Sequence, residues 1–166
     1  MSDLDRFKKA QESRHPGHAD ALAELRAGRK TSHWIWYVFP QLGGLGRSSM
    51  AVRYALADGN EAADYLRDPV LAQRLVAAAG AVRNHVAPGR GAGAPLDVVM
   101  GSDIDALKLV SSMTLFARVA AHLIAAGDAR KELPELVEHA EAILSAAAAQ
   151  GYRRCAHTER LLAPSR

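Results

Sequence analysis

The sequence predicts an all-α fold, a compact multihelical single domain, and three observations carry this prediction. Apolar residues recur at helical spacing over most of the 166-residue chain. Helix-capping residues precede these segments, and glycine or proline follows them. The length suits one domain, because domains typically hold roughly 100–200 residues. We therefore expect one domain, 1–166.

The N-terminal helices are predicted from their caps and breaks. Ser2 with Asp5 resembles a capping box that opens the first helix. Proline and glycine at 16–17 interrupt it. A second helix over 18–27 should end at Gly28, because glycine readily adopts the left-handed conformation that follows a helix.

Three further helices are expected in the middle of the chain. Ser48 or Ser49 can cap a helix that runs to Leu56. Asn60 can cap a short helical turn. A longer helix starts at 68–69, an Asp-Pro pair, because proline in the first helical position loses no hydrogen bond.

The second half of the chain predicts a loop followed by long helices. Residues 87–95 form a flexible Gly/Pro/Ala loop without periodicity. The longest helix follows over 102–126, with a capping box at its start. Another long helix spans about 134–150, and a short one holds 161–162. Residues 163–166 form a short tail.

The segment from His33 to Phe39 (HWIWYVF) fits this scheme least well, because its β-branched and aromatic residues have strand propensity. A lone strand has no adequate partner in this chain, since a two-stranded sheet is only marginally stable. We therefore expect the run to be mostly helical or irregular and buried. Thr31 or Ser32 is the expected N-cap.

Composition and charge exclude several classes of protein. A single cysteine, Cys155, permits no intramolecular disulfide. The net charge of +3 comes from dispersed residues, and the group Arg26, Arg29 and Lys30 is expected to be a solvated face, so nucleic-acid binding is not favoured. No apolar run of the roughly 18 residues that span a membrane is seen. We expect a soluble cytoplasmic protein with no membrane partner, no metal site and no cofactor.

The first candidate site lies in the segment 32–49. Its glycines free the backbone, and a loop that ends in a basic residue and a capped helix start can bind an anion. The aromatic side chains can equally be core. The candidate ligand-binding residues of this segment are His33, Trp34, Trp36, Gln41, Arg47 and Ser48.

The second candidate site is one face of the long helix, where Lys108, Ser111 and Ser112 are three and four residues apart. A lysine on a partly apolar face must snorkel or meet a carboxylate or ligand, because burial of an unpaired ammonium is costly. Alternatively, the serines allow close helix crossing and the lysine is exposed. If the protein is an enzyme, which the residues leave open, Lys108 is the candidate nucleophile or base and His33 the proton carrier.

Three long motifs resemble one bacterial family of unknown function that is often labelled "calpastatin". They are SHWIWYVFPQLGGLGRSSMAVRYAL (32–56), EAADYLRDPVLAQRL (61–75) and DALKLVSSMTLF (105–116). The resemblance implies the compact all-helical fold of the family's mycobacterial structural type member. It implies no activity. The calpastatin label conflicts with the sequence, since that inhibitor is a long disordered chain. Residues 129–154 look longer and richer in alanine than in the family.

The two candidate regions coincide with the family motifs, and together they suggest a function. We expect a pocket between the 32–49 segment and the 102–126 helix that binds a small anionic ligand, such as a phosphate or a nucleotide-like metabolite. The alternative is a non-enzymatic module that binds a protein partner or a second copy of itself as a homo-oligomer. That alternative predicts a contiguous exposed apolar patch.

Overall fold

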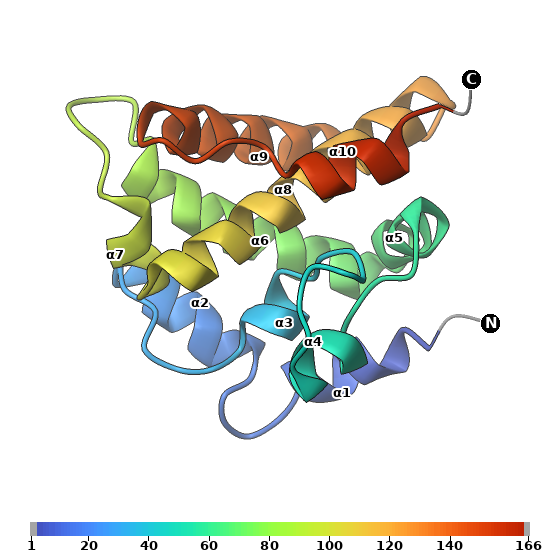
Figure 1. Ribbon diagram of the computed structural model, residues 1–166, viewed down its shortest axis with the longest axis horizontal. Coiled ribbons are helices and arrows are strands. Elements are labelled where there is room, and N and C mark those ends of the chain that lie inside the picture. The colour runs from blue at the N-terminus through green and yellow to red at the C-terminus, as the bar shows by residue number, and fades with distance from the viewer. Residues whose placement is uncertain (1–2, 165–166) are drawn as a thin grey trace.

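The computed structural model describes residues 3–164 and confirms the all-α prediction (Figure 1). The described residues form ten helices and no strand. In chain order they are α1 (Asp5–Gln11), α2 (His18–Arg26), α3 (Ile35–Val38), α4 (Ser49–Arg53), α5 (Gly59–Arg67), α6 (Pro69–Val86), α7 (Leu96–Met100), α8 (Asp103–Ala125), α9 (Glu132–Ala149) and α10 (Ala156–Leu162).

Helix α8 is the central element of the fold. It packs along α9, which returns antiparallel to it, and it also contacts α5, α7 and α10 (Figure 1). Among the described helices, α8 alone is long and apolar enough to cross a membrane by length and composition, with a mean hydropathy of 1.4. Yet 67% of that window is buried, as expected for a core helix of a globular domain.

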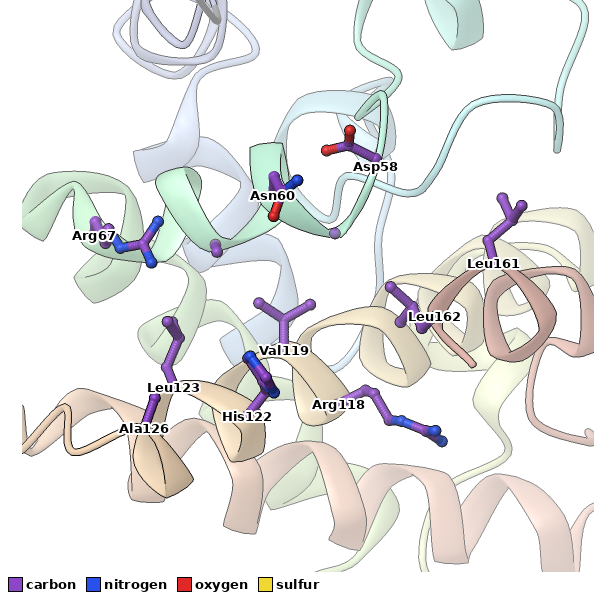
Figure 2. A pocket seen from close by; sticks show the side chains of 12 residues that line it. Asp58, Asn60, Arg67, Arg118, Val119, His122, Leu123, Ala126, Leu161 and Leu162 are labelled. Carbon is purple, nitrogen blue, oxygen red and sulfur yellow. The ribbon is translucent and has the colours of Figure 1, made fainter. Parts of the chain in front are cut away.

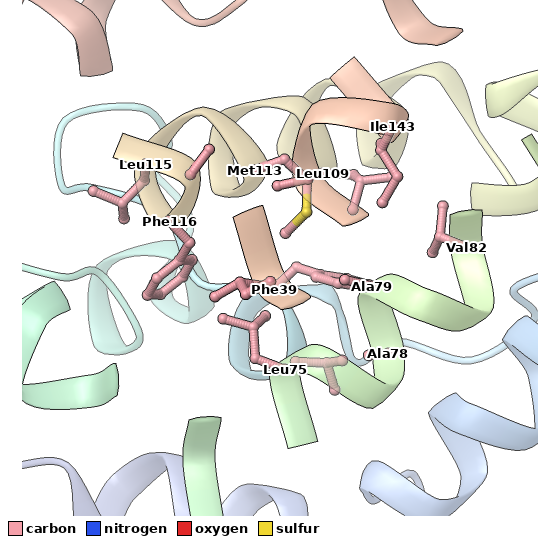
Figure 3. Packing of buried hydrophobic residues seen from close by; sticks show 14 of the residues in the cluster. Phe39, Leu75, Ala78, Ala79, Val82, Leu109, Met113, Leu115, Phe116 and Ile143 are labelled. Atoms are coloured by element: carbon pink, nitrogen blue, oxygen red, sulfur yellow. The ribbon is translucent and has the colours of Figure 1, made fainter. Parts of the chain in front are cut away.

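The core lies between α8, α6, α9 and the aromatic segment around α3. Figure 3 shows Phe39 above Leu75 of α6, with Phe116 and Met113 of α8 and Ile143 of α9 closing the cluster. All five side chains are fully buried. The interleaved small residues, mostly alanines of α6, allow these helices to approach closely.

Three predicted helix starts are confirmed by a side-chain cap. The Ser48 hydroxyl accepts from the Ala51 amide at 3.1 Å, and the Ser102 hydroxyl accepts from the Asp105 amide at 3.1 Å. The Asp68 carboxylate accepts two amides at the start of α6. The capping box predicted at Ser2 and the last residues of the predicted tail lie outside the described part of the chain.

Two boundaries were predicted wrongly. Asn60 does not cap α5; the cap is Asp58, whose carboxylate accepts from the Glu61 amide at 2.9 Å. The helix expected to reach Leu56 ends three residues earlier. Leu56 instead pairs with the 41–43 segment, to which its amide donates (N···O 3.0 Å, to the Gln41 carbonyl), so its backbone is not available to a helix.

The aromatic run is buried and locally helical, as predicted. Residues 35–38 of the run form the single turn α3. His33 is exposed and Trp36 half-buried, whereas Trp34 is completely buried. The predicted caps Thr31 and Ser32 are wrong, since their side chains do not cap this turn. Their backbone amides instead donate to the carboxylate of Glu24 on α2.

Candidate functional site

The most charged buried cluster joins Lys30, Asp105 and Lys108. The Lys30 Nζ lies 2.8 Å from Asp105 Oδ2, and the Lys108 Nζ lies 3.4 Å from Asp105 Oδ1. The three side chains are 5%, 23% and 16% exposed for Lys30, Lys108 and Asp105 respectively. Two ammonium groups therefore share one carboxylate, and the longer contact leaves Lys108 the less neutralised of the two.

Each ammonium also lies over an indole ring. The Lys30 Nζ is 4.9 Å from the Trp34 ring centroid, and the Lys108 Nζ is 5.1 Å from that of Trp36. The negative face of the ring attracts the cation. The two indoles differ at their N–H groups: Trp34 Nε1 donates to Glu24 at 3.2 Å, whereas the buried Nε1 of Trp36 has no partner among the described residues.

Glu24 of α2 fixes the 31–34 segment, which lies beside this cluster, by hydrogen bonds. One carboxylate oxygen accepts from the amides of Thr31 (2.5 Å) and Ser32 (2.7 Å) as well as from the Trp34 indole. Burial raises the pKa of this carboxyl, but the hydrogen bonds outweigh burial and lower its pKa to about 2. The carboxylate is therefore ionised at neutral pH and holds the start of the aromatic segment against α2.

The two serines of the predicted α8 face have different partners. Ser111 is nearly buried, and its hydroxyl donates to the Leu107 carbonyl at 3.1 Å within its own helix. Ser112 is completely buried, and its hydroxyl has no partner among the described residues. Serine hydroxyls in a helix commonly bond the carbonyl four residues earlier, so the unpaired Ser112 is the unusual member.

The remaining predicted residues lie apart from Lys108. His33, Arg47 and Ser48 are exposed, and Ser48 is used as the cap of α4. Gln41 is half-buried, and its carbonyl accepts from Leu56. None of these four side chains makes a hydrogen bond or ion pair with α8 in the described structure. The structure thus brings Trp36 to Lys108, and Trp34 to Lys30 beside it, while no bond joins the other four to α8.

The glycine turn of the 32–49 segment docks on the C-terminal helix α10. The Nε2 of His157 lies 3.0 Å from the Gly43 carbonyl oxygen. Gly44 has a φ of 92°, and a Cβ added there would lie 3.2 Å from the His157 ring. A side chain at this position would be strained and crowded, which gives the turn a structural reason for its glycine.

Cys155 lies at the start of α10, close to the Ser111 face of α8. Burial raises the pKa of its thiol, but the nearby polar groups of Thr158, Ser111 and His157 favour the thiolate and lower the pKa below its ordinary value. The 30–36 segment and Cys155, which are distant from each other along the chain, therefore both lie against the Lys108–Ser112 face of α8.

Sequence reasoning missed four residues of this region: Lys30, Asp105, Glu24 and Cys155. Lys30 was assigned to a solvated face, which is wrong: it is 7% exposed and is paired with a carboxylate 75 positions further along the chain. No local spacing reports such a pair. In the sequence Asp105 fits helix-start chemistry better than a role as a paired carboxylate. A position in the first turn of a helix predicts an acidic residue, but it does not predict which lysines pair with that residue.

The surface cavities found in the described structure lie elsewhere than at this cluster. Five surface cavities of about 240 to 460 Å³ lie in the described structure, and none is lined by Trp36 or Lys108. Within residues 3–164 no three His, Cys, Asp or Glu side chains gather as metal ligands would. What the site offers is an incompletely neutralised ammonium beside two unpaired donors, Trp36 and Ser112.

The comparisons with known proteins agree with this architecture. The sequence profile of a family described as "Protein of unknown function (DUF1810)" matches residues 1–129. The structure is similar to the crystal structure of the conserved hypothetical protein Rv1873 from Mycobacterium tuberculosis, with a TM-score of 0.71, 36% sequence identity and 98% of each chain covered. No curated protein matches the chain. With more than half of its length matched, this all-helical chain belongs to the DUF1810 family.

Proposed function

We propose that this protein binds a small phosphate- or nucleotide-like anion where the 32–49 segment meets α8, within 102–126. One observation carries the proposal: the Lys108 ammonium, only partly neutralised by Asp105, lies on the ring of Trp36, whose buried N–H has no acceptor. An anionic oxygen binds where a cation and an unpaired hydrogen-bond donor lie in neighbouring side chains.

The energetics favour a ligand that supplies acceptors. A buried donor without a partner costs about 1–3 kcal/mol, and a bound anion at this seam would offer that partner to the indole of Trp36. Asp105 is held more closely by Lys30 than by Lys108, so the Lys108 ammonium can turn toward a ligand without leaving the carboxylate unpaired. The indole also offers a face on which a nucleobase can stack.

Catalysis by Lys108, with His33 as proton carrier, stays a prediction. The His33 imidazole is exposed and makes no hydrogen bond to the described residues, so no base is held against the ammonium. Binding without chemistry is the function that this geometry supports best.

Thermal unfolding with pyrophosphate and with AMP tests the proposal. A ligand at 100 times its Kd stabilises by about 2.7 kcal/mol, which corresponds to a Tm increase of about 5–11 °C for a domain of this size. Lys108→Met keeps the methylene contact with Trp36 and removes the charge, so it should abolish the increase. Lys131→Met, at an exposed lysine before α9, is the matched control and should retain it. Equal stabilisation of both variants would contradict the proposal.

A second candidate function is an interaction or self-association surface. Ile104 (66% exposed) and Leu107 (49%) lie one turn apart near the start of α8, and Val98 (49%) lies on the adjacent helix α7. Light scattering with size-exclusion chromatography tests it: a dimer that Ile104→Ser converts to a monomer supports this reading, and a monomeric wild type at high concentration contradicts self-association.

We also place the protein in the cytoplasm. Its one cysteine, Cys155, is a free thiol. A reducing compartment preserves such a thiol.

A further inference from the structure

A surface cavity of about 460 Å³ lies between α5, α8 and α10, away from the Lys108 region (Figure 2). Ligand pockets typically measure about 300–1,000 Å³, so the cavity has room for a small organic molecule. Its floor and one wall are apolar. The side chains that form them are Ala63, Val119, Leu123 and Leu162.

The rim of the same cavity is cationic. Arg118 and His122 line the cavity from α8, four residues apart, and Arg67 lines it from α5. In Figure 2 the Arg118 guanidinium extends away from His122, and the residue also borders a second cavity that Glu141 and Glu159 line. Neither the Arg118 guanidinium nor the His122 imidazole has a hydrogen bond or ion pair with a described residue. Arg67 pairs with Asp64 of its own helix at 2.8 Å.

The one acidic side chain in the lining does not neutralise these cations. It belongs to Asp58, and its Oδ1 accepts from the Glu61 amide as the cap of α5. Arg83 is paired with Glu138 and Arg154 with Glu141, whereas Arg118 makes no ion pair with a described residue. The unpaired Arg118 is therefore the group at this rim with a free planar fork for a carboxylate or phosphate.

Helix α10 closes the apolar wall by a specific contact. A Cβ at Gly59 would lie 3.0 Å from the Cδ2 of Leu162, so the glycine makes room for the leucine at the start of α5. Leu162 thereby lies at the boundary of the cavity. Helix α10 therefore supplies part of the apolar wall, while the basic side chains of the rim come from α8 and α5.

We propose that this cavity is a binding site, separate from the one at Lys108, for a phosphomonoester or carboxylate that carries a small apolar group. Arg118 and His122 hold the anionic group at the rim, and Val119, Leu123 and Leu162 cover the apolar group. An inorganic anion gains only the first interaction and a neutral aromatic alcohol only the second. Both should bind more weakly than a molecule that combines them.

Isothermal titration calorimetry with phenyl phosphate tests this site. The wild type should bind it, and Arg118→Gln and His122→Gln should each raise the Kd about tenfold, the loss of one charge-assisted hydrogen bond. Arg153→Gln, at an exposed arginine outside the cavity that also makes no ion pair with a described residue, is the matched control and should leave the Kd unchanged. Inorganic phosphate and benzyl alcohol should bind at least tenfold more weakly than phenyl phosphate.

A cavity-filling variant separates this site from general attraction of anions. Ala126 is exposed at the end of α8 and lines the cavity, so Ala126→Phe should fill it with no change in charge and abolish binding. Circular dichroism and Tm check that the variant folds. The same titrations in a Lys108→Met background report the cavity alone, and binding that persists there but is lost on Ala126→Phe belongs to this site. The proposal would be overturned if the wild type does not bind phenyl phosphate at 10 mM. It would also be overturned if Arg118→Gln and Ala126→Phe bind it as tightly as the wild type does.

Discussion

Replacement of Asp105 by asparagine tests the buried charge cluster most sharply. The carboxylate is the acceptor that the buried Lys30 ammonium faces at 2.8 Å, and it also holds Lys108 at 3.4 Å. Asparagine keeps the shape and one oxygen but carries no charge. Lys30, at 5% side-chain exposure, then remains as a cation without a counter-ion.

The expected cost follows from what Lys30 retains. Removal of one partner of a buried ion pair costs about 3–5 kcal/mol. Lys30 keeps its hydrogen bond to the Ser32 carbonyl at 2.5 Å and its place over the Trp34 ring, which places the value near the lower end. Lys108 is more exposed and contributes less than about 1 kcal/mol. The free energy of unfolding should fall by about 3 kcal/mol, or roughly 6–12 °C in Tm.

Urea denaturation followed by circular dichroism measures this change. Asp103→Asn is the control, because Asp103 lies in the same first turn of α8 but accepts only from the Tyr152 hydroxyl, at 2.6 Å. The control loses only the helix-dipole contribution of about 0.3–1 kcal/mol. Lys30→Met added to Asp105→Asn should restore most of the stability. A difference below about 1 kcal/mol between Asp105→Asn and its control would refute the reasoning.

Three further outcomes are expected. The pKa of Glu24 is lowered to about 2, so its ionised carboxylate stabilises the fold fully above the unfolded pKa of 4.5. Between pH 4.5 and 2 the free energy of unfolding of the wild type should fall by about 1–2 kcal/mol more than that of Glu24→Gln, after allowance for solvent screening. Urea melts at several acidic pH values measure this, and parallel curves for the two proteins would contradict it. Gly101→Ala should lower the free energy of unfolding by about 2–3 kcal/mol, because Gly101 has a φ of 80° and the new Cβ would lie 2.6 Å from the Lys30 carbonyl oxygen. Gly127→Ala, at a φ of 98° with nothing within 4 Å, should lower it by only about 1 kcal/mol. Equal losses in thermal melts would exclude crowding at Gly101. The rate of Cys155 alkylation by iodoacetamide should rise with a midpoint below that of a free cysteine peptide. A midpoint at or above the peptide's would show that the surrounding polar groups do not offset burial.

The helices could be predicted because their signals are local. Ser48, Asp68 and Ser102 each cap the helix that directly follows them, and such caps act over three residues. The predicted cap Asn60 is wrong because Asp58, two residues earlier, accepts from the Glu61 amide and begins α5 there. Leu56 left its predicted helix because the 41–43 segment, distant along the chain, competes for its backbone.

The candidate site could be predicted only as two segments. The aromatic segment and the Lys108 face do meet, at the contact of Trp36 with Lys108. Lys30 could not be predicted, because its environment is made by α8 and by the indole of Trp34, and neither is visible in the residues beside it. Long-range ion pairs and buried unpaired donors are properties of the packed fold, so sequence periodicity carries no record of them.

The two tryptophans make one measurement decisive for the proposed anion site. Two-dimensional ¹H–¹⁵N NMR shows one indole N–H signal for each, and Trp36→Phe assigns them. Trp34 already donates to Glu24, whereas Trp36 has no acceptor. Titration with pyrophosphate should shift the Trp36 signal and leave the Trp34 signal in place, and Lys108→Met should remove the shift. An unmoved Trp36 signal, or an equal shift in Lys108→Met, would contradict anion binding at this seam.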